Sequence, residues 1–161
     1  MVMNRNKYKQ GFTLTELIVA MVISSIVLAT AGYFLVSFTN TSKDVKALQE
    51  RTYEQNVLVK CFEKFCNTVN LEGQEVVVNN TNPNNISLTA GSPDNLIVLS
   101  INNSAHTLNY NKKNEYKFER ISLINIEMAD KDPKTYIVTI TFDNEKTYEF
   151  PIYLISQKGG N

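Results

Sequence analysis

An uninterrupted apolar segment near the start of the chain constrains the fold most. The 22 residues from Leu17 to Phe38 include no charged residue, no proline and a single glycine. As a helix rising about 1.5 Å per residue, the segment would be about 33 Å long, enough to cross a hydrocarbon core of roughly 30 Å. We therefore expect one membrane-spanning helix, with apolar residues at Leu17, Ile18, Val19, Met21, Val22, Ile23, Ile26, Val27, Leu28, Phe34, Leu35 and Val36.

The charges before this segment predict its orientation. Arg5, Lys7 and Lys9 lie on a short polar leader that has no acidic residue, and Glu16 immediately precedes the apolar run. Basic residues beside a span favour the cytoplasmic side. The sequence therefore predicts a cytoplasmic N-terminus, a single pass, and delivery of everything after Thr39 to the outside.

Three interpretations of the segment compete. A cleaved secretory signal is disfavoured because the apolar run is too long and its end lacks the small-x-small pattern that signal peptidase needs. An ordinary membrane anchor would leave Glu16 as a costly charge at the edge of the span. The third interpretation uses the stretch Gly11-Phe12-Thr13-Leu14-Thr15-Glu16 together with the basic leader and the apolar run. This combination resembles the processing site of type IV prepilins and pseudopilins.

The resemblance implies a division of the chain and a set of partners. A prepilin peptidase would cut after Gly11, and the new N-terminal Phe12 would be N-methylated. Residues 1–11 would be the leader, 12–38 the membrane and filament-core helix, and 39–161 the rest of the helix with an extracellular β-rich domain. The other implied partners are further pilin subunits, an assembly platform in the cytoplasmic membrane, and membrane lipid before assembly.

The resemblance also gives Glu16 a role. In this family the glutamate at this place pairs with the methylated amine of a neighbouring subunit, so Glu16 is expected to meet Phe12 of the next copy. An unpaired amine and carboxylate would both be costly in a dry bundle of helices. The implied function is that of a structural subunit of a type IV pilus or related pseudopilus, first in the cytoplasmic membrane and then in an extracellular filament.

A looser likeness concerns the type of subunit. The strand pattern of Leu96–Ile101, His106–Tyr110, Phe118–Ile121 and the final hairpin is similar to that of W-type minor pilins, J-type pseudopilins and the F-type competence pseudopilin. It implies a minor subunit near the filament tip that primes assembly. A major pilin, a DNA-uptake pseudopilin and an uncleaved membrane-tethered adhesin or binding module stay open as alternatives.

Beyond the span, the apolar spacing predicts that the helix continues. Five apolar residues recur at the spacing of one helix face, which predicts a long helix from about Phe12 to about Asn70, apolar in its first half and amphipathic in its second. Gly32 could bend the helix. The family often has a proline in this region, whereas here Tyr33 follows the glycine, which disfavours local melting. The stripe consists of Leu58, Cys61, Phe62, Phe65 and Val69.

The remaining sequence predicts antiparallel strands. Turn-forming clusters at Asn79–Asn85 and Ala90–Asn95 separate short β-rich runs. The expected fold is therefore α+β, a long N-terminal helix whose amphipathic half packs on an antiparallel β-sheet domain. The predicted runs are Glu75–Val78, Ile86–Thr89, Leu96–Ile101, His106–Tyr110, Tyr116–Ile121, Ile124–Met128, Tyr136–Phe142 and Thr147–Tyr153.

No pattern in the sequence predicts an enzyme, a cofactor or a metal site. Cys61 and Cys66 are too far apart on a helix for the roughly 7 Å limit of a disulfide, so we expect small buried thiols. His106 lies alone in a predicted strand, and Asp130–Pro133 lacks the ligands and glycine of a calcium loop. After loss of the leader, 13 basic and 16 acidic residues remain, without a basic tract. Composition therefore gives no footprint for non-specific nucleic-acid binding.

Overall fold

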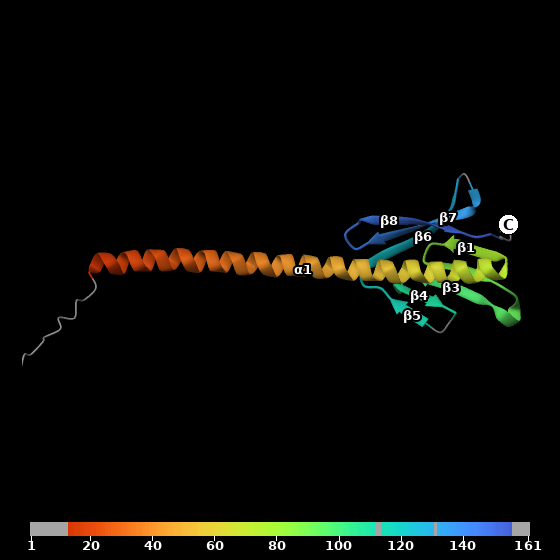
Figure 1. The fold of residues 1–161 in the computed structure, drawn as a ribbon, viewed down its shortest axis with the longest axis horizontal. Helices are drawn as coiled ribbons and strands as arrows, with labels where there is room; N and C mark the ends of the chain where they lie inside the picture. The colour runs from red at the N-terminus through yellow and green to blue at the C-terminus, as the bar shows by residue number, and fades with distance from the viewer. Residues whose placement is uncertain (1–12, 112–113, 131, 156–161) are drawn as a thin grey trace, which may run out of the picture. The chain divides into compact units, whose positions relative to one another are not determined.

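The computed structural model describes residues 13–111, 114–130 and 132–155. Within these ranges the chain forms one long helix followed by antiparallel strands, which confirms the α+β class (Figure 1). It divides into two compact units, one ending at Val45 and one beginning at Lys46. The elements are α1 (Leu14–Glu72), β1 (Val76–Asn82), β2 (Asn85–Ala90), the 3-10 helix η1 (Pro93–Asn95), β3 (Ile97–Asn102), β4 (Thr107–Tyr110), β5 (Asn114–Lys117), β6 (Ile121–Ala129), β7 (Asp132–Phe142) and β8 (Thr147–Tyr153).

The first unit is the N-terminal part of α1. It contains a stretch long and apolar enough to cross a membrane, and none of that stretch is buried. Polar side chains within it bond to their own helix: the hydroxyls of Ser24, Ser25 and Thr30 donate to carbonyls about one turn earlier. Such internal bonds satisfy hydroxyl groups where water is absent. The helix continues through Gly32 without a break.

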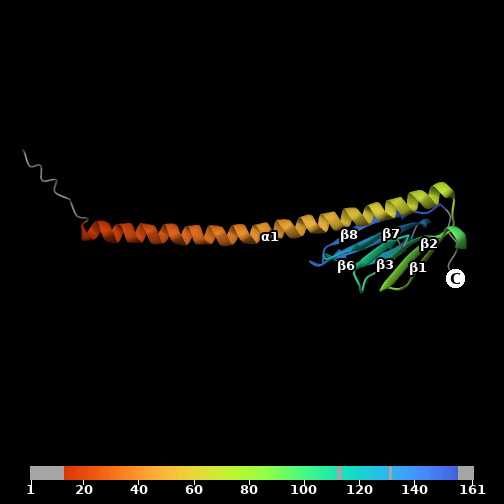
Figure 2. The ribbon, with the colours of Figure 1, turned by 90° about the horizontal axis from the view of Figure 1, so that it is seen from below.

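The second unit contains two antiparallel sheets under the C-terminal half of α1 (Figure 2). Strands β1 to β5 form one sheet in chain order, and β6, β7 and β8 form the other. The predicted stripe on the helix is buried throughout, with Leu58, Phe62 and Phe65 fully inaccessible to solvent. The prediction from helical spacing that this face of the helix packs against the sheet domain is therefore confirmed. The residues that complete the core are led by the strand residues Ile86, Leu88, Leu99, Leu108, Ile124, Ile126 and Ile140, and by Leu154 just after β8.

Asparagine side chains join the two sheets. Asn103, only 7 % exposed, accepts from the Ile124 backbone N–H at 3.0 Å and donates to the Ile124 carbonyl at 2.8 Å. Asn80 donates to the Ile126 carbonyl at 2.9 Å. A primary amide offers the same donor and acceptor as a peptide group. These side chains therefore bond to backbone groups on the edge of β6 that faces away from β7, in place of a neighbouring strand.

The helix ends at a glycine in the left-handed conformation. Gly73 has φ of 62°, its N–H donates to the Asn70 carbonyl at 3.3 Å, and the Gln74 N–H donates to the Val69 carbonyl at 3.0 Å. This pair of bonds is the Schellman arrangement, which satisfies the last carbonyls of a helix. The chain turns there from α1 toward β1.

Two expectations from the strand pattern are wrong in detail. The run Tyr116–Ile121 is not one strand, since β5 ends at Lys117 and β6 begins at Ile121. Between them, backbone N–H groups bond to the Glu54 carboxylate and not to a strand. His106 lies outside β4, is exposed with φ of 52°, and its Nδ1 is 3.0 Å from the Ile121 carbonyl.

Candidate functional site

The first turn of α1 is closed by a reciprocal contact between Thr13 and Glu16. Glu16 Oε2 accepts from the Thr13 backbone N–H at 2.8 Å and from the Thr13 hydroxyl at 2.9 Å. In return, Thr13 Oγ1 accepts from the Glu16 backbone N–H at 3.3 Å. This is a capping box, in which Thr-x-x-Glu satisfies donors that a helix start leaves open. The Thr-x-x-Glu spacing just before the apolar run is the local sequence signal for this cap.

The predicted processing residues fall outside the part of the chain that the structure describes. Gly11 and Phe12 both precede residue 13, so the expected contact between Phe12 and Glu16 of neighbouring copies stays a prediction. Glu16 itself lies at the start of α1, beside a shallow hollow. Thr15, Val19, Ala20 and Ile23 line that hollow together with Glu16.

The predicted span residues surround the helix on every side. All twelve are between 52 % and 72 % exposed. Because each residue turns the helix by about 100°, consecutive positions such as Leu17, Ile18 and Val19 cover all directions and leave no polar face. A helix that is apolar all round requires lipid or other helices around it.

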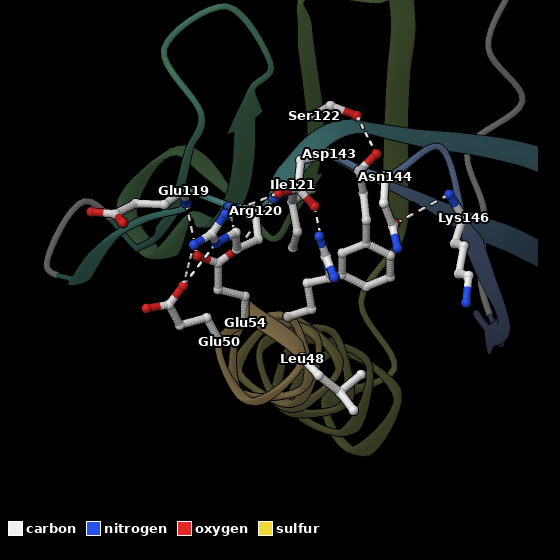
Figure 3. Close-up of polar contacts among 12 residues, drawn as sticks. Leu48, Glu50, Glu54, Glu119, Arg120, Ile121, Ser122, Asp143, Asn144 and Lys146 are labelled. Carbon is white, nitrogen blue, oxygen red and sulfur yellow. Dashed lines mark hydrogen bonds and ion pairs between the residues drawn. The ribbon is translucent and has the colours of Figure 1, made fainter. Parts of the chain in front are cut away.

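In the second unit, a buried carboxylate fixes α1 to the junction between the sheets (Figure 3). Glu54 is 8 % exposed. Its Oε1 accepts from the Glu119 N–H at 2.8 Å, and its Oε2 accepts from the N–H groups of Arg120 at 2.9 Å and Ile121 at 3.1 Å. Three charge-assisted bonds compensate for the burial of this charge.

Ion pairs continue the contact toward the β7–β8 turn (Figure 3). The Arg120 guanidinium lies 2.7 Å from Glu50 and 3.1 Å from Asp143, and Arg51 Nε is 2.6 Å from the other Asp143 oxygen. Hydrogen bonds from Arg51 and then Arg120 hold the pKa of Asp143 below its ordinary value. The network positions the helix on the sheets. No local sequence pattern predicts this network, because its members are far apart in the chain and are brought together only by folding.

The two thiols lie in the helix–sheet core. Cys61 and Cys66 are both free and buried. Burial raises the pKa of Cys66 to about 11, and it also raises the pKa of Cys61. Neither thiol is therefore a thiolate at neutral pH, which is the form that attacks or binds metals. Across the described ranges, no group of three or more His, Cys, Asp or Glu side chains could hold a metal ion.

Comparison with known proteins concerns the N-terminal segment. Residues 6–32 match the family model described as the prokaryotic N-terminal methylation motif. Comparisons with curated proteins and with solved structures gave no match. The matched residues include part of the basic N-terminal segment, the Gly11-Phe12 bond, Glu16 and most of the apolar run. The motif and the long apolar helix together fit a type IV pilin-like subunit that a prepilin peptidase processes and that assembles with other pilins.

Proposed function

We propose that this protein is a minor structural subunit of a type IV pilus or related pseudopilus, assembled by bundling of α1 after cleavage between Gly11 and Phe12. The observation that carries the proposal is the exposed, apolar N-terminal part of α1, whose first turn is closed by the Thr13–Glu16 capping box inside a methylation motif. Lipid covers this helix before assembly, and the helices of neighbouring subunits cover it afterwards.

The capping box explains how Glu16 is accommodated before assembly. Both bonds from Thr13 reach Oε2, and no described residue donates to Oε1. The Oε1 atom is therefore the place where the methylated amine of Phe12 on the next subunit would bind. The new ion pair would form without loss of the cap. Both charges would then be satisfied as water and lipid headgroups are excluded from the bundle.

The assignment to a minor subunit rests on the strand-pattern likeness to W-type, J-type and F-type subunits. The test is mass spectrometry of sheared surface filaments from the native cell, with the peptide that begins at N-methylated Phe12 as the target. A trace amount relative to other pilins supports a minor subunit. The same peptide as the dominant species makes the chain a major pilin. A chain found only in membranes, with residues 1–11 attached, refutes the filament proposal and favours a tethered binding module.

Substitution of Glu16 tests the assembly step. We expect Glu16→Ala to stay in the membrane but to enter filaments much less than the unmodified chain, because the neighbour's amine loses its partner. Glu63→Ala is a matched control, since it removes the same charge from an exposed position of the same helix. Incorporation of Glu16→Ala into filaments at the level of the control would refute the proposed pairing.

A further inference from the structure

The hollow beside Glu16 has an apolar floor and a charged rim. Glu16, Val19, Ala20 and Ile23 stand at positions i, i+3, i+4 and i+7, so they share one face of α1. Ala20 has the shortest side chain of the four, and the hollow, about 390 Å³ in volume, opens outward from it. Its floor is therefore the methyl group of Ala20, its walls are Val19 and Ile23, and its rim carries the Glu16 carboxylate.

Nothing in the described part of the chain fills this hollow. The wall residues Val19 and Ile23 are 52 % and 56 % exposed. Atoms that line an unfilled hollow lose dispersion contacts on one side. Lipid chains can supply these contacts in the membrane, but neighbouring subunits replace lipid in a filament. Packing decides which helix surfaces associate in apolar surroundings, and short side chains there let a partner approach closely. The occupant in a filament is therefore a group that a neighbouring subunit brings to Glu16.

We propose that the phenyl ring of Phe12 from a second copy of this chain occupies the hollow while the methylated amine of the same residue binds Glu16. The inference rests on the proposed function and adds a requirement of shape to the ion pair. In an N-terminal phenylalanine the amine and the ring are joined through one Cα, so they lie roughly 5 Å apart. Glu16 and Ala20 are one helical turn apart, which is roughly 5.4 Å along the axis. One residue with a charge and a ring therefore matches both the rim and the floor.

The contact keeps the spans of the two copies parallel. The second copy lies beside the first with its α1 in the same direction, and its start is level with the stretch from Glu16 to Ala20. At about 1.5 Å per residue, this is a displacement of about 6–12 Å along the axis. The start of one helix meets the side of the other, so the two copies use different surfaces. Such a heterologous contact does not close on itself and can continue into a helical filament.

Ala20 is the specificity-determining residue of this contact. A carboxylate alone accepts any amine, whereas the hollow accepts only a neighbour whose first side chain fits beside Val19 and Ile23. Leucine in place of Ala20 would add three carbon atoms to the floor and fill the hollow. The charge of Glu16 and its bonds with Thr13 would be unchanged, because Ala20 takes no part in the capping box. The substitution therefore separates shape from charge.

The first test measures the ratio of full-length chain in sheared filaments to chain in membranes, in native cells that express one variant at a time. We expect Ala20→Leu to lower this ratio about tenfold. Ala31→Leu makes the same change at an exposed span position away from Glu16 and should stay within about twofold of the unmodified chain. Adding Phe12→Ala to Ala20→Leu shortens the occupant and should recover much of the loss. Equal ratios for the two leucine variants, or no recovery in a double variant that is cut after Gly11, would overturn the proposal.

Photochemical cross-linking gives a second measurement. Benzoylphenylalanine in place of Ile23, on the wall of the hollow, should cross-link to the peptide of a second copy that begins at Phe12. The same group in place of Met21 should not, because two residues turn the helix by about 200° and place it on the opposite face. Cross-links to this peptide from neither position, or equally from both, would overturn the proposal.

Glu16→Ala separates the hollow from the proposed function. If Glu16→Ala fails to enter filaments while Ala20→Leu enters them normally, the ion pair stands and the occupied hollow is refuted. If Glu16→Ala enters filaments normally, the proposed pairing itself fails. Loss of incorporation in both variants, with recovery when Phe12→Ala is added to Ala20→Leu, supports the ring in the hollow together with the ion pair.

Discussion

Replacing Glu54 by alanine removes the acceptor of three backbone N–H groups at once. The Ile121 N–H is buried, whereas those of Glu119 and Arg120 are partly buried. An unsatisfied buried donor costs about 1–3 kcal/mol, and the two partly buried groups regain some of this from water. We therefore expect Glu54→Ala to lower the free energy of unfolding of the β domain by about 3–5 kcal/mol. For a domain of this size that is a decrease in Tm of roughly 12–20 °C.

A graded variant tests the geometry behind this value. In Glu54→Gln, the amide oxygen can still accept from Arg120 and Ile121, but the amide nitrogen then meets the Glu119 N–H donor to donor. We expect a loss of about 1–2 kcal/mol, between the unmodified chain and the alanine variant. Thermal unfolding of the full chain in detergent, followed by the near-ultraviolet signal of its tyrosines, gives the ranking.

Hydrogen exchange locates the effect within the domain. Compared with the unmodified chain, Glu54→Ala should exchange the amides of residues 119–121 faster. The amides of the β2–β3 ladder should change less, because the lost hydrogen bonds are local. Glu63→Ala, with the same loss of charge on an exposed face of α1, should stay within about 0.5 kcal/mol of the unmodified chain. An alanine variant with unchanged Tm and unchanged exchange at these amides would refute the reasoning.

Two further predictions concern charge and backbone conformation. The pKa of Asp143 is lowered in the folded state by Arg51, so its stabilising effect is complete above about pH 4 and is lost as the pH falls through the folded pKa. Asp143→Asn should therefore reduce Tm more at pH 7 than at about pH 2.5, and an equal loss at both pH values would contradict the ion pair. Gly91→Ala should destabilise the domain by more than Gly73→Ala, as measured by denaturant unfolding. Both glycines have positive φ, but a Cβ at Gly91 would lie 2.3 Å from the Asn95 carbonyl oxygen, whereas Gly73 has open space. Equal losses would count against the steric argument.

Much of the fold follows from periodicity, which is a local property of the sequence. The run Leu17–Phe38 has no charged residue and is apolar throughout, which favours an apolar environment. There a helix satisfies the backbone hydrogen bonds within the segment itself. The stripe from Leu58 to Val69 repeats at helical spacing, and the structure buries every member of it. Across the described ranges the β-rich runs between turn clusters correspond to eight strands, except that the run Tyr116–Ile121 crosses the gap between β5 and β6 and His106 lies outside β4. Each of these features depends on neighbours within a few residues.

The candidate processing site also follows from local sequence. The basic leader, Gly11, Phe12 and Glu16 form one short motif, and residues 6–32 match the methylation motif. Cleavage and methylation act on a short segment of chain, so a short segment can identify them. The capping box adds that Glu16 already has partners within its own chain, which the resemblance alone did not indicate.

Sequence alone determined that this protein has an apolar helix with a methylation motif at its start, an amphipathic continuation and a set of antiparallel strands. Tertiary structure decided how the strands divide into two sheets, how asparagines close the edge of β6, and which carboxylate fixes the helix to the sheets. Glu54 and Ile121 are 67 residues apart, a separation that no helical or hairpin pattern spans. The periodicity of apolar residues along the chain indicates which face of a helix or strand is buried. The pairing of polar groups across elements depends on distances in space, and these arise only when the chain has folded.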